Sequence, residues 1–348
     1  MRNASASTED ARSLSRRRNE SIDSLRGLAA LSVFFHHSLG DVFFPYLDLG
    51  RVGVLLFFVI SGYCIFLSVD SLGERPLVPF LIRRVFRLYP VYWISMVLVL
   101  AFDDPGVRWD AILANLTMVQ KAFGYADLVG VYWTLFVEVL FYGVIVLLIA
   151  VGAIRSRAVL LGVFLGILTV LLIGGASRWF GMSLPYGYAG FLATFLLGGL
   201  IYRSDANSGG RDRFPWWALV LVQIVAVIFV GVSVFKDGAV GMETAFSYPA
   251  NYVVAIGFFC LVTRRNCLRV KILGYFGAIS YSVYLFHTIL IHWFDAVFEV
   301  PTAVRLALLF VVVVAFSASM YHAVELPFIA IGKRLSRALS PRRVAVTQ

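Results

Sequence analysis

Long apolar stretches alternate with short polar ones over most of the chain. Ten of these stretches come close to the roughly 17–25 apolar residues that cross a bilayer as a helix. Strict alternation of apolar and polar residues, the sign of a membrane β-barrel, is not present. The pattern predicts an all-α polytopic membrane protein with about ten transmembrane helices, at residues 22–40, 51–69, 88–103, 131–153, 158–176, 185–202, 216–235, 249–263, 274–294 and 304–326.

Composition agrees with this prediction. The 348 residues are 60% hydrophobic and only 14% charged, whereas soluble domains are about half apolar and a quarter charged. We expect a disordered, Ser- and Arg-rich tail at 1–21, one membrane domain at 22–328 and a basic tail at 329–348. The first apolar stretch lacks a small-residue cleavage site after it, so it is read as a retained span. The spacing of the three cysteines does not suit a metal, and none is predicted.

The distribution of basic residues predicts the topology. With the N-terminus in the cytoplasm, 24 of the 30 Lys and Arg residues fall in cytoplasmic segments and six in the outer connections. Such a bias sets the orientation of membrane proteins, and it places both termini inside. The net charge of +10 is thereby explained without a nucleic-acid partner. The lipid bilayer, as a bacterial cytoplasmic (inner) membrane, is the expected environment.

Few ionisable residues lie inside the predicted spans, and such residues are costly there and usually functional. His37 follows Arg26 by eleven residues, about 16 Å along a helix. On this topology Arg26 lies near the inner end of its span, and Glu138 lies in the outer half of another. The full set is Arg26, His36, His37, Glu138, His287, His292, His322 and Glu325.

These residues also have structural interpretations. Neighbours on a helix diverge by about 100°, so at most one of His36 and His37 is expected to face the interior, and a backbone carbonyl could satisfy either ring. Arg84 and Arg87 in FLIRRVFRLYP (80–90) share a helix face. They could anchor the span at the inner surface or bind phosphates with their guanidinium groups. Glu138 has no such simple alternative, because a carboxylate in VYWTLFVEVLFYG needs a partner.

Six of these segments together resemble one family. SLRGLAALSVFFHHS (24–38) is similar to the first-span signature of the membrane-bound acyltransferase-3 family, with Arg26 and His37 at the matching positions. Thr134, Phe286 and Leu55 stand where relatives often have Ser, Trp and a polar residue. The other matching segments, in order, are FFVISGY (57–63), RRVFRLYP (83–90), WTLFVEVLFY (133–142), ISYSVYLFH (279–287) and VELPF (324–328).

The resemblance implies an O-acyltransferase. Cytoplasmic acyl-CoA, commonly acetyl-CoA, would be the co-substrate, with no permanently bound cofactor. The acceptor would be a hydroxyl of a sugar, surface polysaccharide or glycolipid. Arg26, Arg84 and Arg87 would bind the CoA phosphates. His37 would act as general base, with Glu138 orienting its ring. The expected pocket residues are Ser61, Trp133, Tyr142, Tyr281, Tyr284 and His287.

Alternatives remain open at this stage. An acyl-enzyme on Ser61 or Cys64 is conceivable. Buried Arg, His and Glu also occur in proton-coupled secondary transporters and lipid-linked sugar flippases. Transporters usually have two matching halves with interrupted helices, and residues 22–176 and 185–326 do not correspond in this way. A receptor or scaffold would leave Glu138 and the arginine face unexplained.

Overall fold

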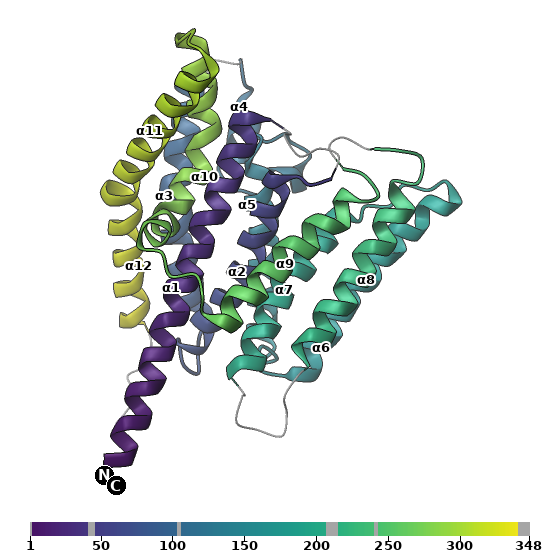
Figure 1. The fold of residues 1–348 in the computed structure, drawn as a ribbon, viewed down its shortest axis with the longest axis vertical. Coiled ribbons are helices and arrows are strands. Elements are labelled where there is room, and N and C mark those ends of the chain that lie inside the picture. The colour runs from purple at the N-terminus through teal and green to yellow at the C-terminus, as the bar shows by residue number, and fades with distance from the viewer. Residues whose placement is uncertain (1, 41–45, 103–105, 207–214, 240–242, 340–348) are drawn as a thin grey trace. The chain divides into compact units, whose positions relative to one another are not determined.

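The computed structural model describes residues 2–40, 46–102, 106–206, 215–239 and 243–339 (Figure 1). Within these ranges the chain is helical and contains no strand, as expected where backbone polar groups must be satisfied without water. The elements are α1 (Arg2–Leu39), α2 (Leu49–Asp70), α3 (Leu77–Phe102), α4 (Trp109–Asn115), η1 (Gln120–Phe123), α5 (Tyr132–Ala150), α6 (Arg157–Ala176), η2 (Ser177–Phe180), α7 (Gly187–Ala206), α8 (Trp216–Val234), α9 (Ser247–Arg265), α10 (Lys271–Val297), α11 (Thr302–Met320), η3 (Tyr321–Glu325) and α12 (Leu326–Ala338).

Seven helical stretches in the described residues are long and apolar enough to cross a membrane, which confirms an all-α membrane protein. They are α2, α3, α5, α6 with η2, α8, α10 and the continuous stretch from α11 to α12. The other three predicted spans coincide with α1, α7 and α9, which fall outside this group. Ten spans and a cytoplasmic location for the termini therefore stay predictions. Helix α1 begins at Arg2 and extends through the predicted N-terminal tail, and α12 includes the first part of the predicted C-terminal tail, of which residues 340–348 lie outside the described ranges.

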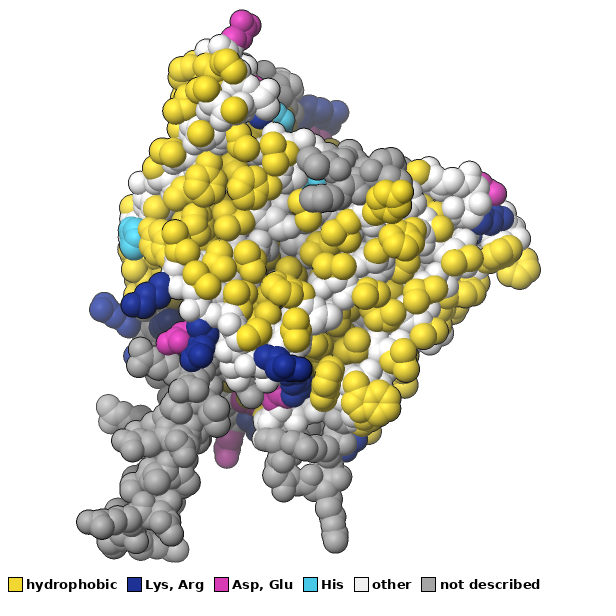
Figure 2. Space-filling view, in the orientation of Figure 1, with side chains coloured by type: hydrophobic (Ala, Val, Ile, Leu, Met, Phe, Trp, Pro, Cys, Tyr) yellow, Lys and Arg dark blue, Asp and Glu magenta, His cyan; other side chains and the backbone are white. Residues whose placement is uncertain are grey.

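The chain forms two compact units, and it passes from one to the other within α2, α6 and α10. The first unit comprises residues 1–63 and 161–284, and the second comprises residues 64–160 and 285–348. In the first unit α7 is largely enclosed, with Phe195, Leu197 and Leu200 fully buried. Helix α8 instead exposes apolar side chains, among them Leu221 and Val225. Figure 2 shows that hydrophobic side chains cover much of the visible surface.

Glycines bring helices of the first unit into backbone contact. A Cβ added to Gly62 of α2 would lie 1.8 Å from the Phe195 carbonyl oxygen of α7, and one added to Gly198 would lie 2.0 Å from the Val59 carbonyl oxygen. Small residues allow this close approach in membrane helices. The two contacts fix the part of α2 on either side of Ser61.

In the second unit α3 packs along α12, and the two helices lie side by side in Figure 1. The connection between α4 and α5 is fixed by the fully buried Asn115. Its side chain donates to the Ala126 carbonyl oxygen at 3.0 Å and accepts from the Leu128 amide at 3.1 Å, while Tyr92 of α3 donates to its carbonyl oxygen at 2.7 Å. These hydrogen bonds of Asn115 fix the loop before α5, the helix that carries Glu138.

Candidate functional site

The two neighbouring histidines of α1 have different surroundings. The His37 ring is exposed, and its Nδ1 lies 2.9 Å from the Val33 carbonyl oxygen. A carbonyl can only accept, so Nδ1 carries the proton of the neutral ring and Nε2 carries the lone pair. The His36 ring is partly buried, and its Nδ1 lies 3.4 Å from Asp48 Oδ1. A Cβ on Gly50 would come within 2.6 Å of the His36 ring, so this ring packs against α2.

Arg26 connects the first and fifth of the sequence motifs inside the first unit. Its guanidinium donates to Ser280 Oγ of α10 at 3.0 Å, and it lies 4.0 Å from Asp23 Oδ1, one turn earlier. Tyr281 and Tyr284 are buried on the same helix, and the Tyr284 ring meets Phe57 of α2 edge to face at 5.9 Å. Arg26 is therefore at least partly a structural residue that joins α1 to α10.

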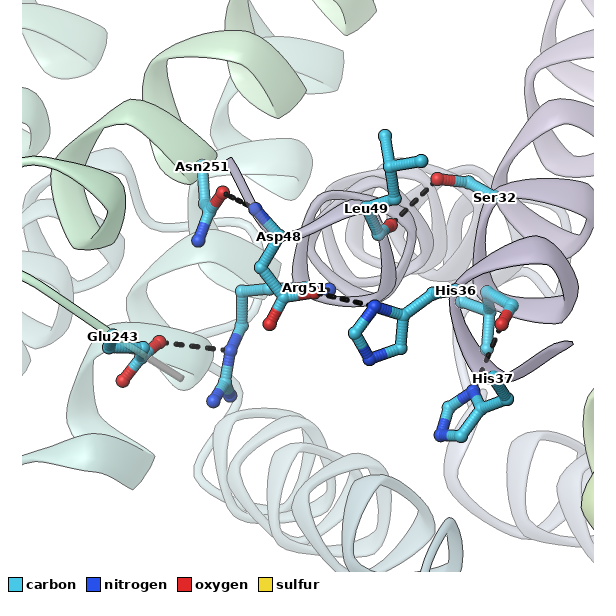
Figure 3. Close-up of polar contacts among 9 residues, drawn as sticks. Ser32, His36, His37, Asp48, Leu49, Arg51, Glu243 and Asn251 are labelled. Carbon is cyan, nitrogen blue, oxygen red and sulfur yellow. Dashed lines mark hydrogen bonds and ion pairs between the residues drawn. The ribbon is translucent and has the colours of Figure 1, made fainter. Parts of the chain in front are cut away.

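A polar cluster surrounds the start of α2 in the first unit (Figure 3). Asp48 caps the helix, because its Oδ1 accepts from the Arg51 amide at 2.8 Å. The Asp48 amide donates to Asn251 Oδ1 at 3.0 Å, which attaches this helix start to α9. Arg51 Nε lies 3.0 Å from Glu243 Oε1, and the guanidinium lies 5.3 Å from the centre of the Phe191 ring. We call Asp48, Arg51, Glu243 and Asn251 the α2-start cluster.

Glu243 lies outside the membrane-spanning helices and is held in a poorly solvated position. Burial raises the pKa of its carboxyl group above the ordinary value of 4.5. The Arg51 guanidinium opposes this rise, and the Asp48 carboxylate adds to it. The α2-start cluster was missed by sequence reasoning, because Asp48 and Asn251 lie 203 positions apart in the chain. The only signal available was a short polar segment, DLGR, directly before an apolar run.

The second unit gathers the cytoplasmic-motif arginines and Glu138. Tyr142 donates a short hydrogen bond to Glu138 one helical turn earlier on α5. Arg84 of α3 lies over the Tyr142 ring, 5.7 Å from its centre, and 5.4 Å from the centre of the Phe80 ring. Arg87 interacts electrostatically with Glu325, Tyr142 and Glu138. The predicted position of Glu138 in the outer half of its span separates it from these arginines, whereas in the structure it interacts electrostatically with Arg87.

The Arg84 guanidinium has unused hydrogen-bonding capacity. Its Nε is buried and has no acceptor among the described residues. Arg83 differs, since its Nε donates to Ser336 Oγ of α12 at 2.9 Å. Of the remaining predicted pocket residues, His287 is fully buried, and Ser61 and Trp133 are partly exposed. His37, Arg26, Ser61, Tyr281 and Tyr284 belong to the first unit, and Arg84, Arg87, Trp133, Glu138, Tyr142 and His287 belong to the second.

The fold and these side chains define an integral membrane protein with ionisable groups inside its helices, the usual setting of a functional site. The sequence model of the acyltransferase-3 family, described as "Acyltransferase domain", matches residues 19–322. The chain belongs to this family of membrane acyltransferases.

Curated relatives extend the comparison. BcsY of Komagataeibacter xylinus, named as a membrane-bound transacylase, is 27% identical over 308 residues, which cover 78% of this chain and 72% of BcsY. The exopolysaccharide production protein ExoZ of Rhizobium meliloti is 28% identical over 251 residues, 69% of this chain and 76% of ExoZ. The peptidoglycan O-acetyltransferase OatA of Listeria monocytogenes is 29% identical over 194 residues, 47% of this chain and 30% of OatA. No solved structure matches the chain.

Proposed function

We propose that this protein is a membrane O-acyltransferase that moves an acyl group, in the first place acetyl, from cytoplasmic acyl-CoA to a sugar hydroxyl. Membership of the acyltransferase-3 family supports the reaction class. The names of ExoZ and OatA, an exopolysaccharide production protein and a peptidoglycan O-acetyltransferase, support a glycan acceptor and an acetyl group.

The arrangement of His37 carries the proposal. The Val33 carbonyl holds the proton on Nδ1, which leaves the lone pair on Nε2 of an exposed ring. In the proposed reaction Nε2 takes the proton from the acceptor hydroxyl as its oxygen attacks the thioester carbonyl. The C–S bond then breaks, and the proton passes to the departing thiolate, giving a sugar ester and CoA. The Val33 carbonyl by itself accounts for the tautomer of the His37 ring. A role of Glu138 in orienting this imidazole stays a prediction.

Donor binding is assigned to the arginine face of α3. The CoA phosphates need cationic, multidentate donors, which guanidinium groups supply. Arg84 has a buried Nε without an acceptor among the described residues, and its guanidinium lies over the rings of Phe80 and Tyr142. Arg87 has the charge of Glu325 and Glu138 nearby, so we assign it a weaker share of phosphate binding.

The test compares two histidines in the purified, full-length protein. His37→Gln should lower acetyl transfer from acetyl-CoA by about 10²–10⁴-fold, the usual contribution of a general base, while acetyl-CoA still binds. His292, an exposed histidine of α10, provides the matched control, and His292→Gln should keep wild-type transfer. Transfer that survives in His37→Gln would remove the base assignment, and a wild-type protein that neither binds nor turns over acetyl-CoA would remove the proposed donor.

A further inference from the structure

The α2-start cluster combines groups that suit a neutral carbohydrate. Hydroxyl groups of sugars both donate and accept, so they match carboxylates, an amide and a guanidinium placed together. The cluster is reachable, because the side chains of Arg51, Glu243 and Asp48 are 23%, 15% and 11% exposed. An aromatic ring stands beside it, since the Arg51 guanidinium lies over Phe191.

One buried donor of the cluster has no partner within the described part of the chain. Asn251 is fully buried, and its Oδ1 is occupied by the Asp48 amide. Its Nδ2 has no acceptor among the described residues, and Figure 3 shows that this nitrogen points to the side on which Glu243 lies. An unpaired buried amide donor costs free energy, and a ligand hydroxyl oxygen would satisfy it. Helix capping alone does not account for this donor.

The cluster also lies next to the proposed base. The His36 side chain contacts Asp48, and the rings of His36 and His37 are 5.0 Å apart, centre to centre. A sugar held at the α2-start cluster would therefore lie near the His37 ring, with the His36 side chain between the cluster and that ring. All of these residues belong to the first unit.

We infer that the α2-start cluster is the acceptor subsite and that it selects a neutral sugar over an acidic one. The inference rests on the proposed function and adds the residues and charge class of the acceptor. Two carboxyl groups contact Arg51, since Asp48 accepts from its backbone amide and Glu243 pairs with its guanidinium. A uronic acid or a phosphate-bearing sugar would meet these carboxyl groups, whereas neutral hydroxyls would find both donors and acceptors.

The experiment uses the purified full-length protein, radiolabelled acetyl-CoA, and two probes, cellopentaose and pentagalacturonate. We expect kcat/KM for cellopentaose to exceed that for pentagalacturonate by at least tenfold. Arg51→Lys should raise KM for cellopentaose about tenfold. Glu243→Gln should lower the ratio of kcat/KM for cellopentaose to kcat/KM for pentagalacturonate about tenfold. Asp110→Asn, which alters an exposed ion pair with Arg108 outside the cluster, is the control and should change neither quantity.

A charge swap separates ligand binding from helix attachment. The double variant Arg51→Glu with Glu243→Arg keeps the ion pair but exchanges its two partners. Its thermal unfolding midpoint should equal that of the wild-type protein, while its KM for cellopentaose should stay elevated, as in Arg51→Lys. Recovery of both quantities would overturn the subsite and leave the cluster as a structural tie. Equal use of both probes, or hydrolysis of acetyl-CoA without transfer to cellopentaose, would also overturn it. Absence of any acetyl-CoA turnover would instead overturn the proposed function.

Discussion

Replacing Arg84 by lysine keeps the positive charge on α3 and removes the planar guanidinium. In the structure this group lies 5.4 and 5.7 Å from the centres of the Phe80 and Tyr142 rings, and its buried Nε has no acceptor among the described residues. If the residue only anchors the helix at the membrane surface, lysine serves equally well. If it binds a CoA phosphate, lysine loses the flat, multidentate contact.

The expected loss can be estimated from the contact that disappears. A charge-assisted hydrogen bond contributes roughly 1.5–3 kcal/mol, which corresponds to about a 10- to 150-fold weaker Kd for CoA. Weaker stacking of lysine on the two rings adds about 0.5–1 kcal/mol at most for a partly exposed site. The variant should therefore fold and insert normally but bind CoA at least tenfold more weakly.

The assay is calorimetric titration of the detergent-solubilised protein with CoA and with dephospho-CoA. Wild-type protein should prefer CoA, and Arg84→Lys should reduce both the affinity and this preference if Arg84 contacts the 3′-phosphate. Arg75→Lys is the control, since Arg75 is exposed before α3 begins. Unchanged CoA affinity in Arg84→Lys would refute phosphate binding by this residue and leave it as an anchor.

Three further predictions concern other parts of the protein. Glu138→Gln, which can keep the hydrogen bond with Tyr142, should lower turnover at least tenfold without weakening CoA binding, and an affinity loss in titrations would contradict this. Gly62→Ala places a methyl group 1.8 Å from the Phe195 carbonyl oxygen and should lower stability by about 1–3 kcal/mol; a melting temperature equal to that of Gly143→Ala, whose added Cβ meets open space, would refute the close contact. Burial raises the pKa of Glu243, so the contribution of this carboxyl group to stability is present below about pH 4.5 and is lost as pH rises through the raised pKa. Glu243→Gln should therefore reduce the pH dependence of the thermal unfolding midpoint across that range. A pH dependence identical to that of the wild-type protein would exclude this effect.

Sequence reasoning succeeded where local patterns decide the structure. Apolar length predicts the helices, because a bilayer leaves the backbone no other way to satisfy its polar groups, and this held for spans such as α2, α5 and α8. The six ordered motifs identified the family, since each combines a polar residue with a fixed apolar frame. The role of Gly62 in helix contact was also predictable, because small residues in apolar helices usually face a neighbouring backbone.

Contacts that depend on tertiary packing were beyond the sequence. Nothing in the spacing shows that Asp48 caps α2 and also binds Asn251 on α9. The position of Glu138 was judged from its distance to the start of its span, which gives depth but not its neighbours. The structure instead places Glu138 within the reach of Arg87 across two helices of the second unit. The π-helical turn at Tyr321–Glu325 was likewise not visible in the apolar run.

The most direct test of the central claim follows the acyl group itself. Purified protein in liposomes is supplied with acetyl-CoA carrying ¹³C in the acetyl carbonyl, together with a neutral oligosaccharide, and the sugar is examined by mass spectrometry and NMR. The proposed function predicts a labelled ester on a sugar hydroxyl, with one CoA thiol released for each ester formed and both products lost in His37→Gln. Proton-driven movement of the unmodified sugar across the liposome membrane, without labelled ester or free CoA, would contradict an acyltransferase and identify a transporter instead.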